Sequence, residues 1–155
     1  MLHLAIKNNP RFRLSDVESR MPGKSFTVNL LNRLHEEFPE SELFFLVGRD
    51  AFFEMHTWFK YREVFGLASI GVLNRPECAE EEIGRYLQDK ISDSYRVCSG
   101  GMISHPDLPP VYILRNTRMD VSSTRIRELA SEDLSVRYLV PDEVLGYITD
   151  NQLYK

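Results

Sequence analysis

The sequence lacks a long hydrophobic run and an excess of basic charge, and we expect no leader segment. Its longest uninterrupted apolar stretch, Leu43–Val47, is far too short to span a bilayer. The first residues contain neither a long apolar segment nor a small-residue cleavage site, so we predict no signal peptide. A formal net charge of -4 argues against a general nucleic-acid or membrane-binding surface. We therefore expect a cytoplasmic protein that binds small molecules, with no nucleic acid and no membrane among its partners.

Cysteine is also scarce. Cys78 and Cys98 are far apart in the sequence, and neither has a second cysteine nearby, so their spacing suggests neither a zinc knuckle nor a redox pair. One disulfide between them is an alternative, but two free thiols in a reducing cytoplasm are favoured. The four histidines show no metal-ligand spacing either, and we assign no metal ligand: His3, His35, His56 and His105.

Helical periodicity alternates with short apolar runs along the 155 residues, a length typical of one domain. We expect helices over 1–7, 26–38, 50–55 and 80–91, and strands over 11–17, 43–47, 69–73, 95–97 and 111–114. Asp50 is placed to cap the third of these helices. This alternation predicts an α/β fold with a doubly wound parallel sheet, whose ligand lies beyond the carboxyl ends of the strands.

One helix start stands out from the others. Three hydroxyl side chains and two arginines crowd the segment Val121–Arg127, although a helix start carries a partial positive charge that disfavours basic residues. Elsewhere the chain follows the rule, with acids opening the segments at 80–82 and 142–143. A bound phosphate would satisfy the unpaired amides, the hydroxyls and at least one arginine together. The alternative is a serine N-cap with solvated arginines.

Several motifs, in order, resemble those of the nicotinate-nucleotide adenylyltransferases, members of the nucleotidyltransferase superfamily. Val121–Arg127 is similar to the C-terminal motif Ile-Ser-Ser-Thr-x-Ile-Arg, and Tyr138–Pro141 begins a match to the closing Val-Pro-x-x-Val-x-x-Tyr-Ile helix. Leu43–Asp50 is similar to a strand that ends in Gly-x-Asp. Three shorter matches keep the family's order: Ser25-Phe26-Thr27, Trp58 and Arg75-Pro76. The resemblance covers nearly the whole chain and implies a Rossmann-like nucleotidyltransferase fold over residues 1–155.

The resemblance also implies a reaction, in which ATP and nicotinate mononucleotide give nicotinate adenine dinucleotide and pyrophosphate, normally with Mg²⁺. It assigns the ATP phosphates to Ser123, Thr124 and Arg127. Ser122 and Arg75 are further candidates for contacts with ATP, whereas Arg125 falls on a variable position of the motif.

The same resemblance assigns the ribose and the pyridine ring. Asp50 would accept hydrogen bonds from ribose hydroxyls, and Gly48 would allow close approach. Trp58 would stack on the pyridine ring, while Thr27 and the backbone of Phe59 would meet the nicotinate carboxylate.

One family signature is absent from this sequence. Family members open with a glycine-rich strand that leads to His-x-Gly-His, and no histidine pair here has that spacing. We expect a chain that is N-terminally truncated, lacking the first βα segment, and that is weak or inactive by itself. A diverged protein that has lost catalysis is the alternative explanation.

Two other functions stay open at this point. A sister adenylyltransferase or cytidylyltransferase could share the phosphate turn, and a non-catalytic nucleotide-binding module could lack the histidines. The sequence does not determine the oligomeric state, and a homo-oligomer is compatible with it.

Overall fold

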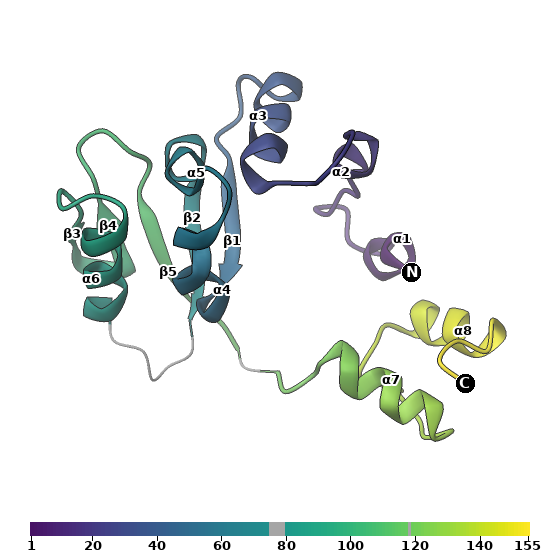
Figure 1. Cartoon of the computed structure of the whole chain (residues 1–155). Coiled ribbons are helices and arrows are strands. Elements are labelled where there is room, and N and C mark those ends of the chain that lie inside the picture. The colour runs from purple at the N-terminus through teal and green to yellow at the C-terminus, as the bar shows by residue number, and fades with distance from the viewer. Residues whose placement is uncertain (75–79, 118) are drawn as a thin grey trace. The chain divides into compact units, whose positions relative to one another are not determined.

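The computed structural model of this chain describes residues 1–74, 80–117 and 119–155. These residues form two compact units, which we call the sheet unit (Val17–Arg118) and the helical unit (Met1–Asp16 with Met119–Lys155). Figure 1 labels their helices and strands. The expectation of a single domain over residues 1–155 stays a prediction.

The sheet unit contains a five-stranded sheet with the order β1-β2-β5-β4-β3. Its strands are β1 (Phe44–Gly48), β2 (Ser69–Asn74), β3 (Arg96–Val97), β4 (Met102–Ser104) and β5 (Val111–Arg115). β1, β2 and β5 are parallel neighbours, whereas β4 runs antiparallel to both β5 and β3. The carboxyl ends of the parallel strands, at Gly48, Asn74 and Arg115, therefore lie along one edge of the sheet. The predicted parallel α/β sheet is confirmed for these strands, and the antiparallel β3–β4 hairpin adds to it.

Helices alternate with the parallel strands, as the sequence predicted. Those of the sheet unit are α2 (Val17–Arg20), α3 (Thr27–Glu37), α4 (Arg49–Glu54), α5 (Tyr61–Leu67) and α6 (Glu80–Lys90), with short 3₁₀ turns η1 (Met55–Thr57) and η2 (Ser99–Gly101). The helices expected at 26–38, 50–55 and 80–91 are confirmed as α3, α4 and α6. Three glutamates form the first turn of α6, the placement that the helix dipole favours.

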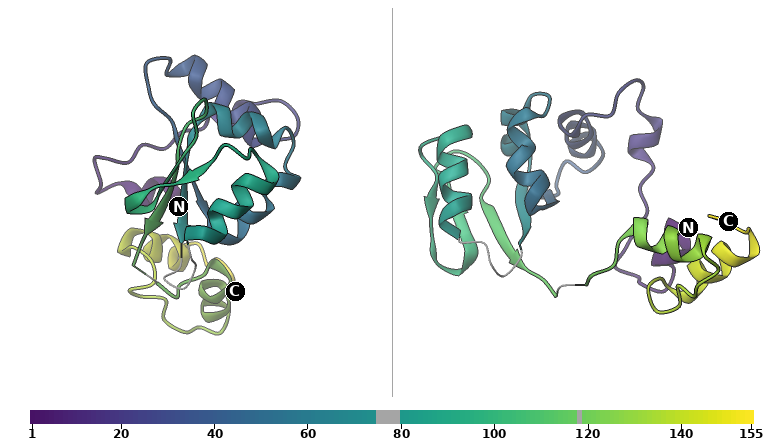
Figure 2. Two further views of the ribbon diagram at one scale, coloured as in Figure 1. Left: turned by 90° about the vertical axis from the view of Figure 1, so that its left-hand side faces the viewer. Right: turned by 60° about the horizontal axis from the view of Figure 1, so that its bottom comes forward.

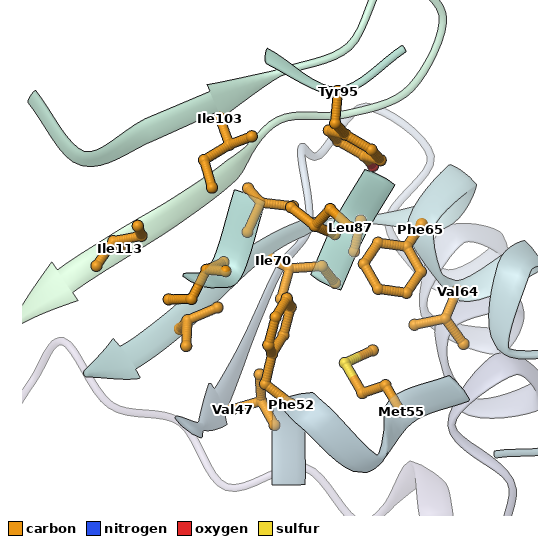
Figure 3. Close-up of a cluster of buried hydrophobic side chains, with 14 of the residues drawn as sticks. Val47, Phe52, Met55, Val64, Phe65, Ile70, Leu87, Tyr95, Ile103 and Ile113 are labelled. Atoms are coloured by element: carbon orange, nitrogen blue, oxygen red, sulfur yellow. The ribbon is translucent and has the colours of Figure 1, made fainter. Parts of the chain in front are cut away.

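One face of the sheet forms the core of this unit. Ile70 and Val72 of β2 and Ile113 of β5 point to this face and are buried. Helices α3 to α6 contribute side chains to the same cluster, among them Leu31 of α3. Figure 3 shows Phe52, Phe65 and Leu87 in this cluster. The parallel strands and the helices that connect them are thus held by a single apolar layer.

Tyr95 is the largest fully buried side chain of this core. Its ring centroid lies 4.8 Å from that of His105, and its hydroxyl has no hydrogen-bond partner among the described residues. The Nδ1 atom of His105 accepts the backbone N–H groups of Asp107 and Leu108, at 3.0 and 3.1 Å. His105 therefore has a structural role in the turn that it begins.

The opposite face of the sheet leaves apolar side chains exposed. Phe44 and Leu46 of β1 are 53% and 57% exposed. Gly71 lies beside them on β2, where an added Cβ would come 2.5 Å from the Leu46 side chain. The continuous apolar run of β1 predicted a strand covered on both faces. Within the described part of the sheet unit, the core helices pack against the other face.

The helical unit has a small core of its own. It contains α1 (Leu2–Ile6), α7 (Ser123–Ser131) and α8 (Asp142–Asp150), and α1 packs beside α8 although the two are far apart in sequence (Figure 2). Leu4 lies against a buried cluster of Ala130, Val136, Val144 and Ile148. Asn8 donates a hydrogen bond of 2.8 Å to the Glu143 carboxylate. Together with the backbone amide of Glu143 itself, this bond lowers the pKa of that carboxyl.

The strand expected over residues 11–17 is wrong. Residues 11–16 are irregular, and Val17 begins α2. Phe12 and Leu14 are 63% and 48% exposed, and no described strand pairs with this segment. Alternating apolar residues form a strand only where a neighbour can bind the backbone N–H and C=O groups.

Candidate active site

The start of α7 is a serine-capped helix terminus. Ser122 has an extended backbone, and its Oγ accepts a hydrogen bond of 3.1 Å from the backbone N–H of Arg125. The serine N-cap that the sequence left as an alternative is therefore present. It satisfies only one of the unpaired amides at the helix start.

The other polar groups near this helix start are open to a ligand. Ser123, Thr124 and Arg127 are exposed, and among the described residues none of their side chains has a hydrogen-bond or ion-pair partner. The first turn contains no acidic residue, whereas Arg125 pairs with Glu128 at 3.4 Å. Two backbone amides, two hydroxyls and one guanidinium thus remain for an anion.

The β1–α4 turn begins at Gly48, at the carboxyl end of β1. Gly48 is the N-cap of α4, with φ -68° and ψ 150°, and an added Cβ would meet nothing within 4 Å. The predicted capping role of Asp50 is therefore wrong, because the helix begins directly after the strand and Asp50 lies in its first turn. The Asp50 side chain is 80% exposed, and the open space beside Gly48 leaves room for a ligand to approach.

Arg49, between Gly48 and Asp50, is already engaged in contacts with other side chains. Its Nη2 atom donates hydrogen bonds of 3.0 and 3.1 Å to the two carboxylate oxygens of Glu82 on α6. The sequence did not predict this link, because the two residues are 33 positions apart and belong to different helices.

The residues assigned to the pyridine nucleotide lie in the sheet unit. Thr27 is the first residue of α3, and the ring of Phe26 before it lies 4.5 Å from the ring of Phe59. Trp58 is half-buried and meets the ring of Phe45 edge-on at 6.1 Å. Phe59 is 49% exposed. The structure thus packs Phe26, the residue before Thr27, against Phe59 and anchors Trp58 on the core.

His56, which precedes these aromatics, is held by its neighbours. Its backbone N–H donates to the hydroxyl of Tyr86 at 3.0 Å, and its Nδ1 lies 2.9 Å from the carbonyl oxygen of Phe53. Tyr86 lies near Phe52 and Phe53, with ring centroids 5.1 Å from each. Burial raises the pKa of the Tyr86 hydroxyl. Tyr86 thus supports the segment that leads to Trp58, a role that no sequence motif indicated.

The predicted site residues are divided between the two units. Gly48, Asp50, Thr27, Trp58 and Phe59 belong to the sheet unit, and the Ser122–Arg127 turn belongs to the helical unit. Arg75 lies outside the described residues. In the part of the chain that the structure describes, no group of three or more His, Cys, Asp or Glu side chains could hold a metal ion. No helix there is both long and apolar enough to cross a membrane.

Known sequences resemble the chain over its whole length. A model of the cytidylyltransferase-like family matches residues 1–129. A probable nicotinate-nucleotide adenylyltransferase of Trichlorobacter lovleyi is 39% identical over 155 residues, which cover 100% of this chain and 73% of the relative. The chain belongs to the nicotinate-nucleotide adenylyltransferase family. A probable nicotinate-nucleotide adenylyltransferase of Dechloromonas aromatica is 37% identical over 158 residues, which cover 100% of this chain and 72% of that protein.

The adenylyltransferase fold is also seen in a solved structure. A Plasmodium falciparum nicotinic acid mononucleotide adenylyltransferase complexed with APC matches with a TM-score of 0.68 at 17% identity, covering 99% of this chain and 72% of the other. This confirms the Rossmann-like nucleotidyltransferase fold that the motifs implied. The α7 start and the β1–α4 turn each resemble an adenylyltransferase motif in sequence.

Proposed function

We propose that this chain transfers AMP from ATP to nicotinate mononucleotide, giving nicotinate adenine dinucleotide and pyrophosphate in NAD synthesis. Family membership over the whole chain supports the reaction class. The single structural observation that carries the proposal is the α7 start. There the Ser123 and Thr124 hydroxyls and the Arg127 guanidinium have no partner among the described residues, and the first turn contains no acid. A helix terminus of this composition suits a polyanion.

The reaction requires little covalent chemistry from the protein. An oxygen of the mononucleotide phosphate forms a bond to the α-phosphorus of ATP, and the bond to the bridging oxygen breaks, so that pyrophosphate leaves with the electron pair. Catalysis then consists of orientation and of neutralising the phosphate charge. We assign the phosphate contacts to Ser123, Thr124 and Arg127, with Ser122 fixing the geometry of the turn and contributing a further contact.

The sheet unit would bind the sugar and the base. Asp50 is an exposed carboxylate, which suits a hydrogen-bond acceptor for ribose hydroxyls, and Gly48 leaves space beside it. Trp58 offers a ring anchored on the core for stacking on the pyridine. Thr27 and the Phe59 backbone are assigned to the nicotinate carboxylate, and Arg75 stays a candidate contact with ATP.

We propose Mg²⁺ as part of the substrate, Mg·ATP. The described residues offer no cluster of metal-binding side chains, and Mg²⁺ in such sites is commonly bound by substrate phosphates with few protein ligands. The partners in the proposed reaction are small molecules, ATP and nicotinate mononucleotide. The cytoplasm is the expected location. A homo-oligomer is compatible with the sequence, which does not determine the oligomeric state.

The 155-residue sequence contains no His-x-Gly-His, so we propose that the chain alone turns over slowly or not at all. The test is a coupled assay of pyrophosphate release with ATP and nicotinate mononucleotide, beside the Trichlorobacter lovleyi relative. We expect a rate far below that of the relative, with nicotinate adenine dinucleotide identified by chromatography. A rate equal to that of the relative would overturn the slow-turnover proposal.

A second candidate is a nucleotide-binding module without transfer activity, and the missing histidine motif favours it. A sister adenylyltransferase or cytidylyltransferase is a third. Thermal shifts with nicotinate mononucleotide, nicotinamide mononucleotide, phosphopantetheine, ATP and CTP would separate them, because a bound ligand raises the melting temperature. Stabilisation by ATP and nicotinate mononucleotide supports the adenylyltransferase. Binding without product, even when the histidine segment of a relative is fused to the chain, would favour the binding module.

A further inference from the structure

The guanidinium of Arg49 is held on three sides. Glu82 on α6 accepts its two hydrogen bonds of 3.0 and 3.1 Å. On its own helix, Nη1 lies 3.5 Å from the Asp50 carboxylate oxygen. The Phe53 ring packs against the guanidinium, with its centroid 4.9 Å from Cζ. Two carboxylates and one aromatic face thus fix the position of a single cation.

These contacts argue against Arg49 as a direct ligand of phosphate. Moving the guanidinium to a phosphate would break its hydrogen bonds to Glu82 and leave the Glu82 and Asp50 carboxylates without their shared cation. Close carboxylates and a polyphosphate repel one another. We therefore expect the Arg49 guanidinium to stay between the Glu82 and Asp50 carboxylates when ATP binds.

We propose that Arg49 is a positioning residue for Asp50, and that its bond to Glu82 fixes the β1–α4 turn against the start of α6. This inference rests on the proposed function, in which Asp50 accepts hydrogen bonds from ribose hydroxyls, and it takes this ribose to be that of ATP. An exposed carboxylate samples several rotamers, and ordering it on binding reduces affinity. The ion pair with Arg49 restricts the rotamers of the Asp50 side chain. It also offsets the negative charge of Asp50, which reduces the repulsion of an approaching polyphosphate.

The test compares the binding of ATP with that of 2′-deoxy-ATP and 3′-deoxy-ATP by calorimetry, using the full 155-residue chain. A hydrogen bond to a charged acceptor corresponds to a preference of roughly tenfold or more for the hydroxyl. We expect the native chain to show this preference, Asp50→Asn to lose most of it, and Arg49→Met to lower it to about threefold or less. If Arg49 acts through Asp50, the double variant Asp50→Asn with Arg49→Met shows no further loss.

Two further variants keep the test sharp. Arg33→Met removes another arginine in an ion pair, which binds Glu36 on α3 at 2.6 Å, and should leave the preference unchanged. Arg49→Lys keeps the charge without the planar fork. Its preference for the hydroxyl should lie below that of the native chain and above that of Arg49→Met. It also provides a folded variant if Arg49→Met does not fold. A native preference that survives unchanged in a folded Arg49→Met chain overturns the positioning role alone. Where Arg49→Met fails to fold, an unchanged preference in Arg49→Lys overturns it instead. Absence of any ATP binding by the native chain overturns the proposed function, and this inference with it.

Discussion

The start of α7 and the β1–α4 turn each place an arginine close to a helix start, but the two arginines have different surroundings. Arg127 on α7 is exposed and has no ion pair among the described residues. Arg49 on α4 is bound by Glu82, Asp50 and Phe53. The difference teaches that partners, rather than position in a motif, decide whether an arginine is available to a ligand.

The largest effect on ligand binding is expected at Arg127. Replacing it by Met should weaken ATP binding by about tenfold to a hundredfold, because a charged hydrogen bond to phosphate contributes about 1.5–3 kcal/mol. The melting temperature should stay unchanged, since no described group depends on this side chain. Calorimetric titration with ATP and a thermal melt of the same sample measure both. Unaltered ATP affinity would remove Arg127 from the phosphate site.

Arg49 should show the opposite balance between stability and binding. Arg49→Met is expected to lower the free energy of unfolding by about 1–2 kcal/mol, because it removes the hydrogen bonds to Glu82 and the ion pair with Asp50. Urea unfolding of the variant, with Arg33→Met as the matched control, measures this loss. If Arg49→Met were as stable as the native chain, the contrast between the two arginines would fail.

Ser122 affects the α7 start through the backbone. Ser122→Ala should destabilise the chain by about 1 kcal/mol through loss of the N-cap hydrogen bond, whereas Ser122→Asp keeps an acceptor. The Asp variant should also repel ATP, because its charge lies where the phosphate is proposed to bind. Urea unfolding and ATP titration separate the two effects. Tighter ATP binding by Ser122→Asp would contradict an anion site at this turn.

The smallest effect is expected at Arg125, two residues before Arg127. Its pair with Glu128 is exposed on both sides, at 58% and 53%, so Arg125→Gln should change stability by less than about 0.5 kcal/mol. ATP affinity should change by less than about twofold, since the charge is screened and offset by Glu128. The same titration as for Arg127→Met is the measurement. Equal losses in the two variants would mean that the turn attracts ATP by net charge alone.

The main elements of the fold could be predicted because their signals are local. The apolar run before Gly48 predicted β1, and the glutamates at 80–82 predicted the start of α6. β4, at Met102–Ser104, was missed because three residues show no periodicity. α5, at Tyr61–Leu67, was missed because it is short and contains Gly66. The strand expected at residues 11–17 failed because no neighbouring strand pairs with it.

In the candidate site, too, local features could be predicted from the sequence and contacts between distant residues could not. Ser122 as a cap and the lack of acid at the α7 start follow from the sequence alone, because the groups involved are neighbours on one turn. The bond from Arg49 to Glu82 could not be predicted from the sequence, since it depends on how α4 and α6 pack. Tyr86 supports His56 for the same reason, through a contact between residues 30 positions apart.

The buried hydroxyl of Tyr95 has an optical consequence. Burial raises the pKa of Tyr95 from its ordinary value of 10.0 to about 12. The unfolded chain therefore loses this proton at lower pH than the folded chain, so the stability linked to the neutral phenol is fully present below pH 10 and is lost as the pH rises through 12. In an alkaline titration followed by ultraviolet absorbance, Tyr95 should therefore ionise at higher pH in the folded chain than in the unfolded chain. The Tyr95 part of that absorbance change thus reports the opening of the core itself.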